Sequence, residues 1–221
     1  LFTKGYYIIQ DEASALVASS IGFPLDKEYK ILDTCAAPGG KSLHIASKYF
    51  NSTLISCDKY IHKLKLIEDN KEKLGITNIQ VKEQDATVNN NSFIENFDIV
   101  VCDVPCSGIG VIKNKPEIKY KITNAYIEDI AKLQYQILEN SKNYVKQGGT
   151  LMYSTCTIDK RENIRNIEKF LKENKDFSLE NITLNNSIVK SRENGVLEIL
   201  PDEYSCDGFF IAKLKKMEAK C

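Results

Sequence analysis

The feature that most constrains the fold is a regular alternation of short apolar stretches with longer amphipathic segments. The apolar stretches are rich in β-branched residues, which favour buried strands, and they are Tyr29–Cys35, Thr53–Cys57, Ile79–Glu83, Phe97–Asp103, Gly149–Thr155 and Phe209–Leu214. The segments with helical periodicity are Asp11–Ser20, Lys41–Phe50, Tyr60–Leu74, Asn124–Val145 and Lys160–Lys172. Strands and helices in this order predict a doubly wound, mostly parallel α/β sheet with helices on both faces.

The length and patterning of the chain predict a single domain. With 221 residues it is long enough for one sizeable α/β unit. Residues 1–28 are expected to form a helical lead-in. Residues 174–200 are rich in Asn and weakly patterned, so we expect a variable loop region there with at most one strand, Phe177–Leu179. Because position 1 is Leu rather than Met, we expect an N-terminal region to be missing from this chain.

The charges and cysteines narrow the class of protein. Thirty basic residues balance thirty acidic ones, which argues mildly against a large nucleic-acid surface because Lys and Arg make the phosphate contacts. The chain lacks an apolar run long enough for a membrane span and lacks a signal-peptide layout at its start. Its seven cysteines are an odd number, so we expect reduced thiols in a cytoplasmic compartment, with an organelle as the open alternative. We expect a monomer without a membrane or metal partner.

The ends of the first three predicted strands carry residues suited to an adenosine-bearing cofactor. Ligands of such sheets bind outside the carboxyl ends of the strands. The first strand leads into the turn Cys35-Ala-Ala-Pro-Gly-Gly-Lys41, whose glycines let backbone approach a ligand closely before a helix begins. Asp58 follows the second strand and Asp85 the third, where carboxylates can accept from ribose hydroxyls and an adenine amino group. The glycine turn alone is as often a plain strand–helix turn, and each Asp alone is more often an ordinary strand-end or helix-cap residue, but the three in order favour the cofactor.

Thiols follow the fourth and fifth predicted strands. The fourth ends in Asp103-Val-Pro-Cys106-Ser-Gly and the fifth in Ser154-Thr-Cys156-Thr. A single cysteine is usually a small buried hydrophobic residue, and we interpret four others in this way: Cys35, Cys57, Cys102 and Cys206. Cys106 and Cys156 instead leave strands beside polar or Gly residues, at the expected ligand crevice. We therefore predict that both thiols and Asp103 meet in one site.

These motifs resemble those of the Sun/Fmu (RsmB-like) family of RNA (cytosine-5) methyltransferases. Further motifs match the family in the same order, namely Ile9-Gln-Asp-Glu-Ala-Ser14, Lys115-Pro-Glu-Ile-Lys-Tyr120, Glu162-Asn163 and Asp207-Gly-Phe-Phe210. Together the matches run from about Gly5 to Lys216, and so many ordered matches are not expected by chance. The resemblance implies that residues 1–221 are a catalytic domain with the Rossmann-like fold of S-adenosylmethionine-dependent methyltransferases.

The resemblance also implies a role for each residue of the site. Carbon 5 of cytosine becomes nucleophilic once a thiolate adds to carbon 6, and the family gives that role to Cys156. Asp103 would stabilise the proton gained at ring nitrogen 3, and Cys106 would assist release of the product. The residues implied to bind S-adenosylmethionine are Cys35, Ala36, Ala37, Pro38, Gly39, Gly40, Lys41, Asp58, Asp85 and Asp103. A reactive Cys156 needs a cationic or helix-N-terminal environment, for which Lys41 and the helix predicted to start at Lys160 are the candidates.

The segment after the Cys106 motif is the candidate RNA contact. Its members are Lys113, Lys115, Lys119, Tyr120 and Lys121. A charge run is as often a solvated surface, but beside the active-site loop it is expected to hold the RNA backbone and stack an unpaired base. The family usually has Trp in place of Tyr120 and often Arg where this chain has Lys113 or Lys115. It also implies RNA as the partner, with small-subunit ribosomal RNA first, and a helical N-terminal RNA-binding domain that is absent from this chain.

Several alternatives stay open from the sequence. Transfer RNA or another RNA could be methylated by the same chemistry. Small-molecule and DNA methyltransferases share the cofactor fold, but the DNA enzymes use the Pro-Cys cysteine as nucleophile and lack a counterpart of Cys156. A non-catalytic RNA-binding scaffold would have no use for both thiols. An NAD-dependent dehydrogenase is disfavoured because the G-x-G-x-x-G spacing is absent.

Overall fold

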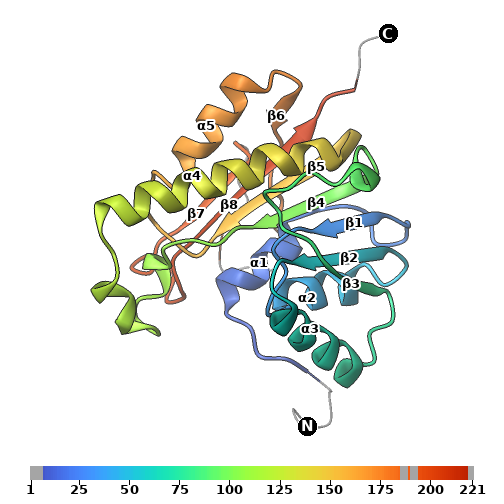
Figure 1. Ribbon diagram of the computed structural model, residues 1–221, viewed down its shortest axis with the longest axis horizontal. Coiled ribbons are helices and arrows are strands. Elements are labelled where there is room, and N and C mark those ends of the chain that lie inside the picture. Colours follow the sequence, from blue (N-terminus) through green and yellow to red (C-terminus); the bar gives the residue numbers. More distant parts are fainter. Residues whose placement is uncertain (1–6, 185–188, 190–193, 219–221) are drawn as a thin grey trace.

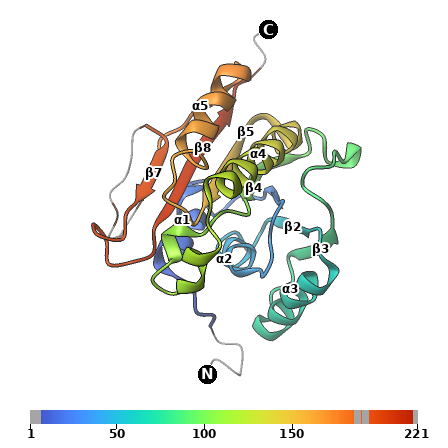
Figure 2. The same cartoon turned by 60° about the vertical axis from the view of Figure 1, so that its left-hand side comes forward.

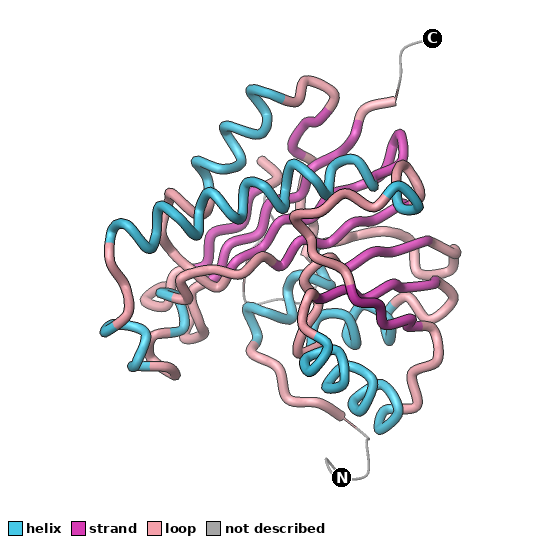
Figure 3. Tube along the Cα trace, viewed as in Figure 1, coloured by secondary structure: helices cyan, strands magenta, loops and turns pink. Residues whose placement is uncertain are grey.

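The chain folds around one mixed sheet, which the computed structural model describes over residues 7–184, 189 and 194–218. The start of the predicted lead-in with Gly5, parts of the 174–200 region and Cys221 therefore lie outside the described residues. The strands are β1 (Lys30–Asp33), β2 (Thr53–Asp58), β3 (Ile79–Glu83), β4 (Phe97–Asp103), β5 (Val145–Thr155), β6 (Phe177–Leu179), β7 (Val196–Ile199) and β8 (Phe209–Lys216). The α-helices are α1 (Glu12–Ser20), α2 (Gly40–Lys48), α3 (Ile61–Leu74), α4 (Asn124–Ser141) and α5 (Ile164–Glu173), and Figure 3 shows them packed around the strands.

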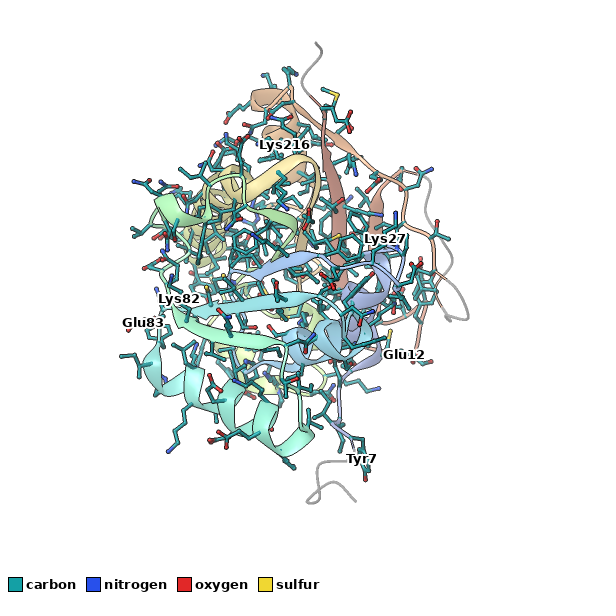
Figure 4. The ribbon with its side chains drawn as sticks, turned by 90° about the vertical axis from the view of Figure 1, so that its right-hand side faces the viewer. Tyr7, Glu12, Lys27, Lys82, Glu83 and Lys216 are labelled. Atoms are coloured by element: carbon teal, nitrogen blue, oxygen red, sulfur yellow. The ribbon has the colours of Figure 1, made fainter. Side chains whose placement is uncertain are left out.

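The strand order confirms the predicted doubly wound, mostly parallel sheet. It runs β3-β2-β1-β4-β5-β8-β6, with β7 also paired to β8. β1 to β5 pair in parallel, whereas β8 runs antiparallel to β5. Lys82 and Glu83 lie on β3 at one edge, far from Lys216 on β8 (Figure 4). The order reverses between β1 and β4, and this switch point is where a sheet of this kind forms its ligand crevice.

Helices cover both faces of the sheet (Figures 1 and 2). Successive residues of a strand point to opposite faces, so Ile99 and Val101 of β4 join the core under α1 and α2, while Val100 and Cys102 join the core under α4 and α5. All four side chains are buried. Burial on both faces explains why the β4 sequence is apolar without alternation.

Several elements differ from the sequence predictions, and the start of β5, the 174–200 region and the start of α5 are the most informative. β5 begins at Val145, not at Gly149, because Val145 pairs with Phe97 before a register shift in the ladder. The region 174–200 contains β7 in addition to the predicted β6. The helix expected from Lys160 begins at Ile164; the preceding residues form a turn tied to the end of β5, in which the Asn163 side chain bonds Thr155 and Thr157.

None of the described helices combines the length and apolar character needed to cross a membrane.

Candidate active site

A pocket of about 460 Å³ lies outside the carboxyl ends of the parallel strands, at the switch point of the sheet. Its lining comes from the segments that follow β1, β2, β3, β4 and β5, and from α4. Asp58, Asp85, Asp103, Cys106 and Cys156 all line it. The structure therefore brings together side chains that are up to about a hundred residues apart in the sequence, as the strand-end pattern predicts.

Two carboxylates stand at one end of this pocket, where β2 and β3 finish. Oδ1 of Asp58 accepts a hydrogen bond from the backbone N–H of Tyr60 at 3.0 Å. Oδ1 of Asp85 accepts from the hydroxyl of Thr87 at 2.7 Å and from its backbone N–H at 2.9 Å. These bonds hold the pKa of Asp85 below its ordinary value. Both side chains are thus oriented acceptors, suited to hydroxyl and amino groups of a ligand.

The glycine turn after β1 lies at the pocket and lines it in part. Cys35 and Ala37 line the pocket, whereas Ala36, Pro38, Gly39, Gly40 and Lys41 do not. Gly39 has a φ of 108° and faces Ile67 of α3, where an added Cβ would lie 3.2 Å from Cγ1. This glycine therefore allows α2 to begin and to pack closely against α3.

The Cys106 and Cys156 thiols face each other at the other end of the pocket, with 3.0 Å between their sulfur atoms. They follow β4 and β5, which are neighbouring parallel strands in register from Ile99–Thr150 to Asp103–Ser154. The six cysteines in the described part of the chain are all free thiols. Two neighbouring strands that are each followed by a cysteine thus place the two sulfur atoms in direct contact.

An ion pair stands beside the thiols. Nζ of Lys41 lies 2.7 Å from Oδ2 of Asp103, and their side chains are only 16% and 24% exposed. The hydroxyl of Ser154 donates to Oδ1 of Asp103 at 2.7 Å. Burial lowers the pKa of Lys41, but the Asp103 carboxylate, together with Cys156 and Asp33, holds that pKa above its ordinary value. Lys41 therefore stays cationic next to the sulfur atoms.

The surroundings of the two thiols shift their pKa values in opposite directions. A hydrogen bond from Cys106 lowers the pKa of Cys156, and the charges of Lys41 and Lys115 lower it further against the effects of burial and Asp103. The same hydrogen bond, together with burial, raises the pKa of Cys106 well above its ordinary value. Of the two candidates for the cationic or helix-N-terminal environment, Lys41 is one of the charges beside Cys156, whereas the helix predicted to start at Lys160 begins only at Ile164.

A backbone contact between two glycines fixes the loop that carries Cys106. The N–H of Gly110 donates to the carbonyl of Cys156 at 3.1 Å, and the N–H of Gly208 donates to the carbonyl of Gly110 at 2.8 Å. A Cβ added to Gly110 would lie 2.1 Å from the Gly208 carbonyl oxygen. The Asp207-Gly-Phe-Phe210 motif therefore supplies the Cys106 loop with a neighbour that has no side chain.

Gly110→Ala is expected to destabilise the protein by about 1–3 kcal/mol, the range for overpacking a filled site. Two backbones would have to separate, since neither contact atom belongs to a flexible side chain. Thermal unfolding measures the effect. The control is Gly40→Ala, whose Cβ would meet only Nε2 of Gln10 at an ordinary 3.8 Å. Equal melting temperatures for the two variants would contradict this account of Gly110.

The lysine segment lies outside the pocket. Lys113, Lys115, Lys119 and Lys121 are exposed, and Tyr120 is 80% exposed. The segment includes the short 3-10 helix Pro116–Tyr120, and Figure 1 shows this yellow-green stretch projecting from the sheet ahead of α4. Nζ of Lys119 lies 4.8 Å from the centre of the Tyr120 ring. Of these lysines, Lys115 acts on the pKa of Cys156.

Several pocket residues have no counterpart in the sequence prediction. Leu133 and Ile137 of α4 form an apolar wall, and Tyr60 and Lys63 lie beside Asp58. Tyr60 lies two residues after Asp58, a predicted cofactor-binding residue, and could be found by that position. The α4 residues carry no local signal, because they have the pattern of any helix that covers a sheet. Among the described residues, His, Cys, Asp and Glu form no cluster that could hold a metal ion.

Comparisons with known proteins agree on one family. The family model described as 16S rRNA methyltransferase RsmB/F matches residues 22–215. The probable ribosomal RNA small subunit methyltransferase B of Bacillus subtilis is 42% identical over 221 residues, which cover 97% of this chain and 49% of that protein. Ribosomal RNA small subunit methyltransferase F of Escherichia coli is 30% identical, over 98% of this chain and 46% of that protein.

A solved structure gives the same result. The crystal structure of NSun6 from Pyrococcus horikoshii with SFG superposes with a TM-score of 0.83 and 31% sequence identity, over 99% of this chain and 55% of that one. The chain thus spans about half the length of the curated relatives it matches. The family match covers most of the chain, and it includes the pocket and both thiol-bearing loops. This chain belongs to the 16S rRNA methyltransferase RsmB/F family.

Proposed function

We propose that residues 1–221 are a catalytic domain that transfers a methyl group from S-adenosylmethionine to carbon 5 of a cytosine in RNA, with small-subunit ribosomal RNA as the first candidate substrate. The observation that carries the proposal is the contact of two thiols, 3.0 Å apart, inside a pocket whose other end presents two carboxylates. Addition to carbon 6 of a pyrimidine ring uses a thiol as nucleophile and a second thiol can assist its release, whereas methyl transfer to an ordinary nucleophile needs neither.

The pocket fits the cofactor in size and in donor set. Its volume of about 460 Å³ lies within the usual range for small-molecule sites. Asp58 would accept from both ribose hydroxyls and Asp85 from the adenine amino group, with the apolar side chains of Leu133 and Ile137 beside them. When bound, S-adenosylmethionine supplies an electrophilic methyl group. The thiol end of the pocket then receives the cytosine.

The two thiols have different roles in the proposed reaction. The Cys156 thiolate adds to carbon 6 of the ring while Asp103 stabilises the proton gained at nitrogen 3. The ring is then an enamine, so carbon 5 attacks the methyl group, whose bond to the cofactor sulfur breaks. A base then takes the proton from carbon 5, the electron pair forms the double bond between carbons 5 and 6, and the Cys156 sulfur leaves as a thiolate; Cys106 assists this step. The lowered pKa of Cys156 and the raised pKa of Cys106 support this assignment rather than its reverse.

Methyl transfer from radiolabelled S-adenosylmethionine tests the proposal. Small-subunit ribosomal RNA, transfer RNA and cytosine-containing DNA serve as the competing acceptors, and the product base is identified by mass spectrometry. We expect 5-methylcytosine in the ribosomal RNA. Product in transfer RNA alone would move the substrate to that class, product in DNA alone would overturn the RNA assignment, and binding of RNA without product would favour a non-catalytic scaffold.

Asp58→Ala is expected to weaken cofactor binding by about ten- to hundredfold. It removes a charged hydrogen-bond acceptor, and one hydrogen bond to a charged group is worth about 1.5–3 kcal/mol, which corresponds to roughly ten- to hundredfold in affinity. Isothermal titration with S-adenosylmethionine measures the change. Asp69→Ala, an exposed carboxylate of α3 outside the pocket, is the matched control. An unchanged affinity in Asp58→Ala would remove Asp58 from the cofactor site.

A further inference from the structure

A carboxylate that does not reach the pocket lies beneath the two thiol loops. Glu162 is 0% exposed and is not part of the pocket lining. None of the ion pairs formed by the described residues includes it. Burying a carboxylate without a cation is costly unless hydrogen bonds replace its water. The groups that donate hydrogen bonds to the Glu162 carboxylate therefore indicate its role.

The donors come from both thiol loops and from α4. Oε2 accepts from the backbone N–H of Ser107 and from Nε2 of Gln134, each at 2.8 Å. Oε1 accepts from the hydroxyl of Ser107 and, at 3.2 Å, from the hydroxyl of Thr157. Ser107 directly follows Cys106, and Thr157 directly follows Cys156. One carboxylate thus connects the two loops at the residue next to each thiol.

The network extends to the other side of Cys106. Nε2 of Gln134 also donates to the carbonyl of Pro105 at 2.9 Å, so the residues before and after Cys106 are both attached to the same cluster. The hydroxyls of Ser107 and Thr157 lie 2.9 Å apart. The hydroxyl of Tyr153 donates to the carbonyl of Glu162. Glu162 is therefore held in place by β5 while it holds the two loops.

We propose that Glu162 is a positioning residue, whose buried carboxylate sets the approach of Cys106 and Cys156 by holding Ser107 and Thr157. The inference rests on the proposed function of the two thiols. A carboxylate suits the role because it only accepts, and its two oxygens here meet donors on every side. A glutamine of the same shape would turn an N–H group toward donors and lose the bonds to one side.

Alkylation of Cys156 tests this positioning without any RNA or methyl transfer. The groups that face the Cys156 sulfur are Cys106, Asp103, Lys41 and Lys115. When the loops separate, the hydrogen bond from Cys106 is lost, while Asp103 and Lys41 stay paired to each other. We expect Glu162→Gln to move the pH midpoint of iodoacetamide labelling at Cys156 upward by about one pH unit. Peptide mass spectrometry distinguishes Cys156 from the other cysteines.

The same variant is then assayed for methyl transfer. A displacement of reacting groups by about 1 Å can cost about a hundredfold in rate, so we expect kcat to fall by roughly 10- to 100-fold. The KM for S-adenosylmethionine should stay unchanged, because Glu162 does not line the pocket. Glu168→Gln, on the exposed face of α5, is the matched control and should change neither quantity.

Ser107→Ala provides a second and milder variant. If Glu162 acts through Ser107, the double variant Ser107→Ala/Glu162→Gln should be no slower than Glu162→Gln alone. An unchanged labelling midpoint and kcat in Glu162→Gln would overturn the inference, as would a melting temperature that falls while the midpoint stays. If Glu162→Gln does not fold, Ser107→Ala tests the inference by the same two measurements, the pH midpoint of labelling at Cys156 and kcat. Parent protein that labels normally at Cys156 but transfers no methyl group would instead count against the proposed function.

Discussion

Cys106→Ala is expected to leave the protein covalently attached to its RNA. In this variant Cys156 keeps the cationic neighbours Lys41 and Lys115, so it can still add to carbon 6 and the ring can still take up the methyl group. The group that assists breakage of the carbon–sulfur bond is missing. The adduct should therefore accumulate as a protein–RNA species that survives denaturing electrophoresis.

Cys156→Ala is the informative counterpart. Without the attacking thiol no adduct can form, and we expect turnover to fall by roughly 10⁴-fold or more, as when a nucleophile is removed elsewhere. Cofactor binding should persist because Asp58 and Asp85 are untouched. Cys206→Ala removes a partly buried thiol outside the pocket and is the control for cysteine loss as such.

Denaturing electrophoresis of the two cysteine variants with RNA distinguishes three mechanisms. An adduct in Cys106→Ala alone supports Cys156 as the nucleophile. An adduct in Cys156→Ala alone would reverse the roles, as in the DNA enzymes. Absence of an adduct from both variants, with only a stability loss of about 1–3 kcal/mol, would make both thiols structural. The charges of Lys41 and Lys115 beside Cys156 make the first outcome the expected one, because they favour the thiolate on Cys156.

The sequence was sufficient for the fold class and for the place of the pocket. Apolar strands bounded by turns predict a parallel sheet, and the topology of such sheets then places the residues after each strand at one edge. This is why Asp58, Asp103 and Cys156, far apart in the chain, could be predicted to lie together. The family resemblance added chemical roles, which the variants proposed above test.

Features that depend on packing could not be predicted in this way. Glu162 was visible as part of a motif, but its hydrogen bonds come from Gln134 and from two loops that only the folded sheet brings together. The predicted helix begins at Lys160, whereas α5 begins at Ile164 because the Asn163 side chain bonds Thr155 and Thr157. Tertiary hydrogen bonds thus overrode a local preference.

Replacing Lys113, Lys115, Lys119 and Lys121 together with alanine is expected to weaken RNA binding strongly. These lysines are exposed on a segment that starts near the Cys106 loop and ends before α4. Each phosphate contact with single-stranded nucleic acid contributes about 0.7 to the slope of log affinity against log salt. Loss of four contacts should therefore lower that slope by about 3, and the affinity near 0.1 M salt should fall by roughly two to three orders of magnitude.

The control variant must remove the same positive charge from surface positions outside this segment. Lys65, Lys132, Lys172 and Lys175 are exposed and lie outside the pocket and outside this segment, so their replacement leaves the net charge equal to that of the first variant. Fluorescence anisotropy with an RNA containing an unpaired cytosine, measured from low to high salt, compares the two. If the slope of log affinity against log salt falls equally in both variants, the segment is a solvated surface and only the total charge matters. If the slope falls in the first variant alone, the lysines hold the RNA backbone, and Tyr120→Ala should then weaken binding further without changing the slope, because stacking on a base releases no counterions.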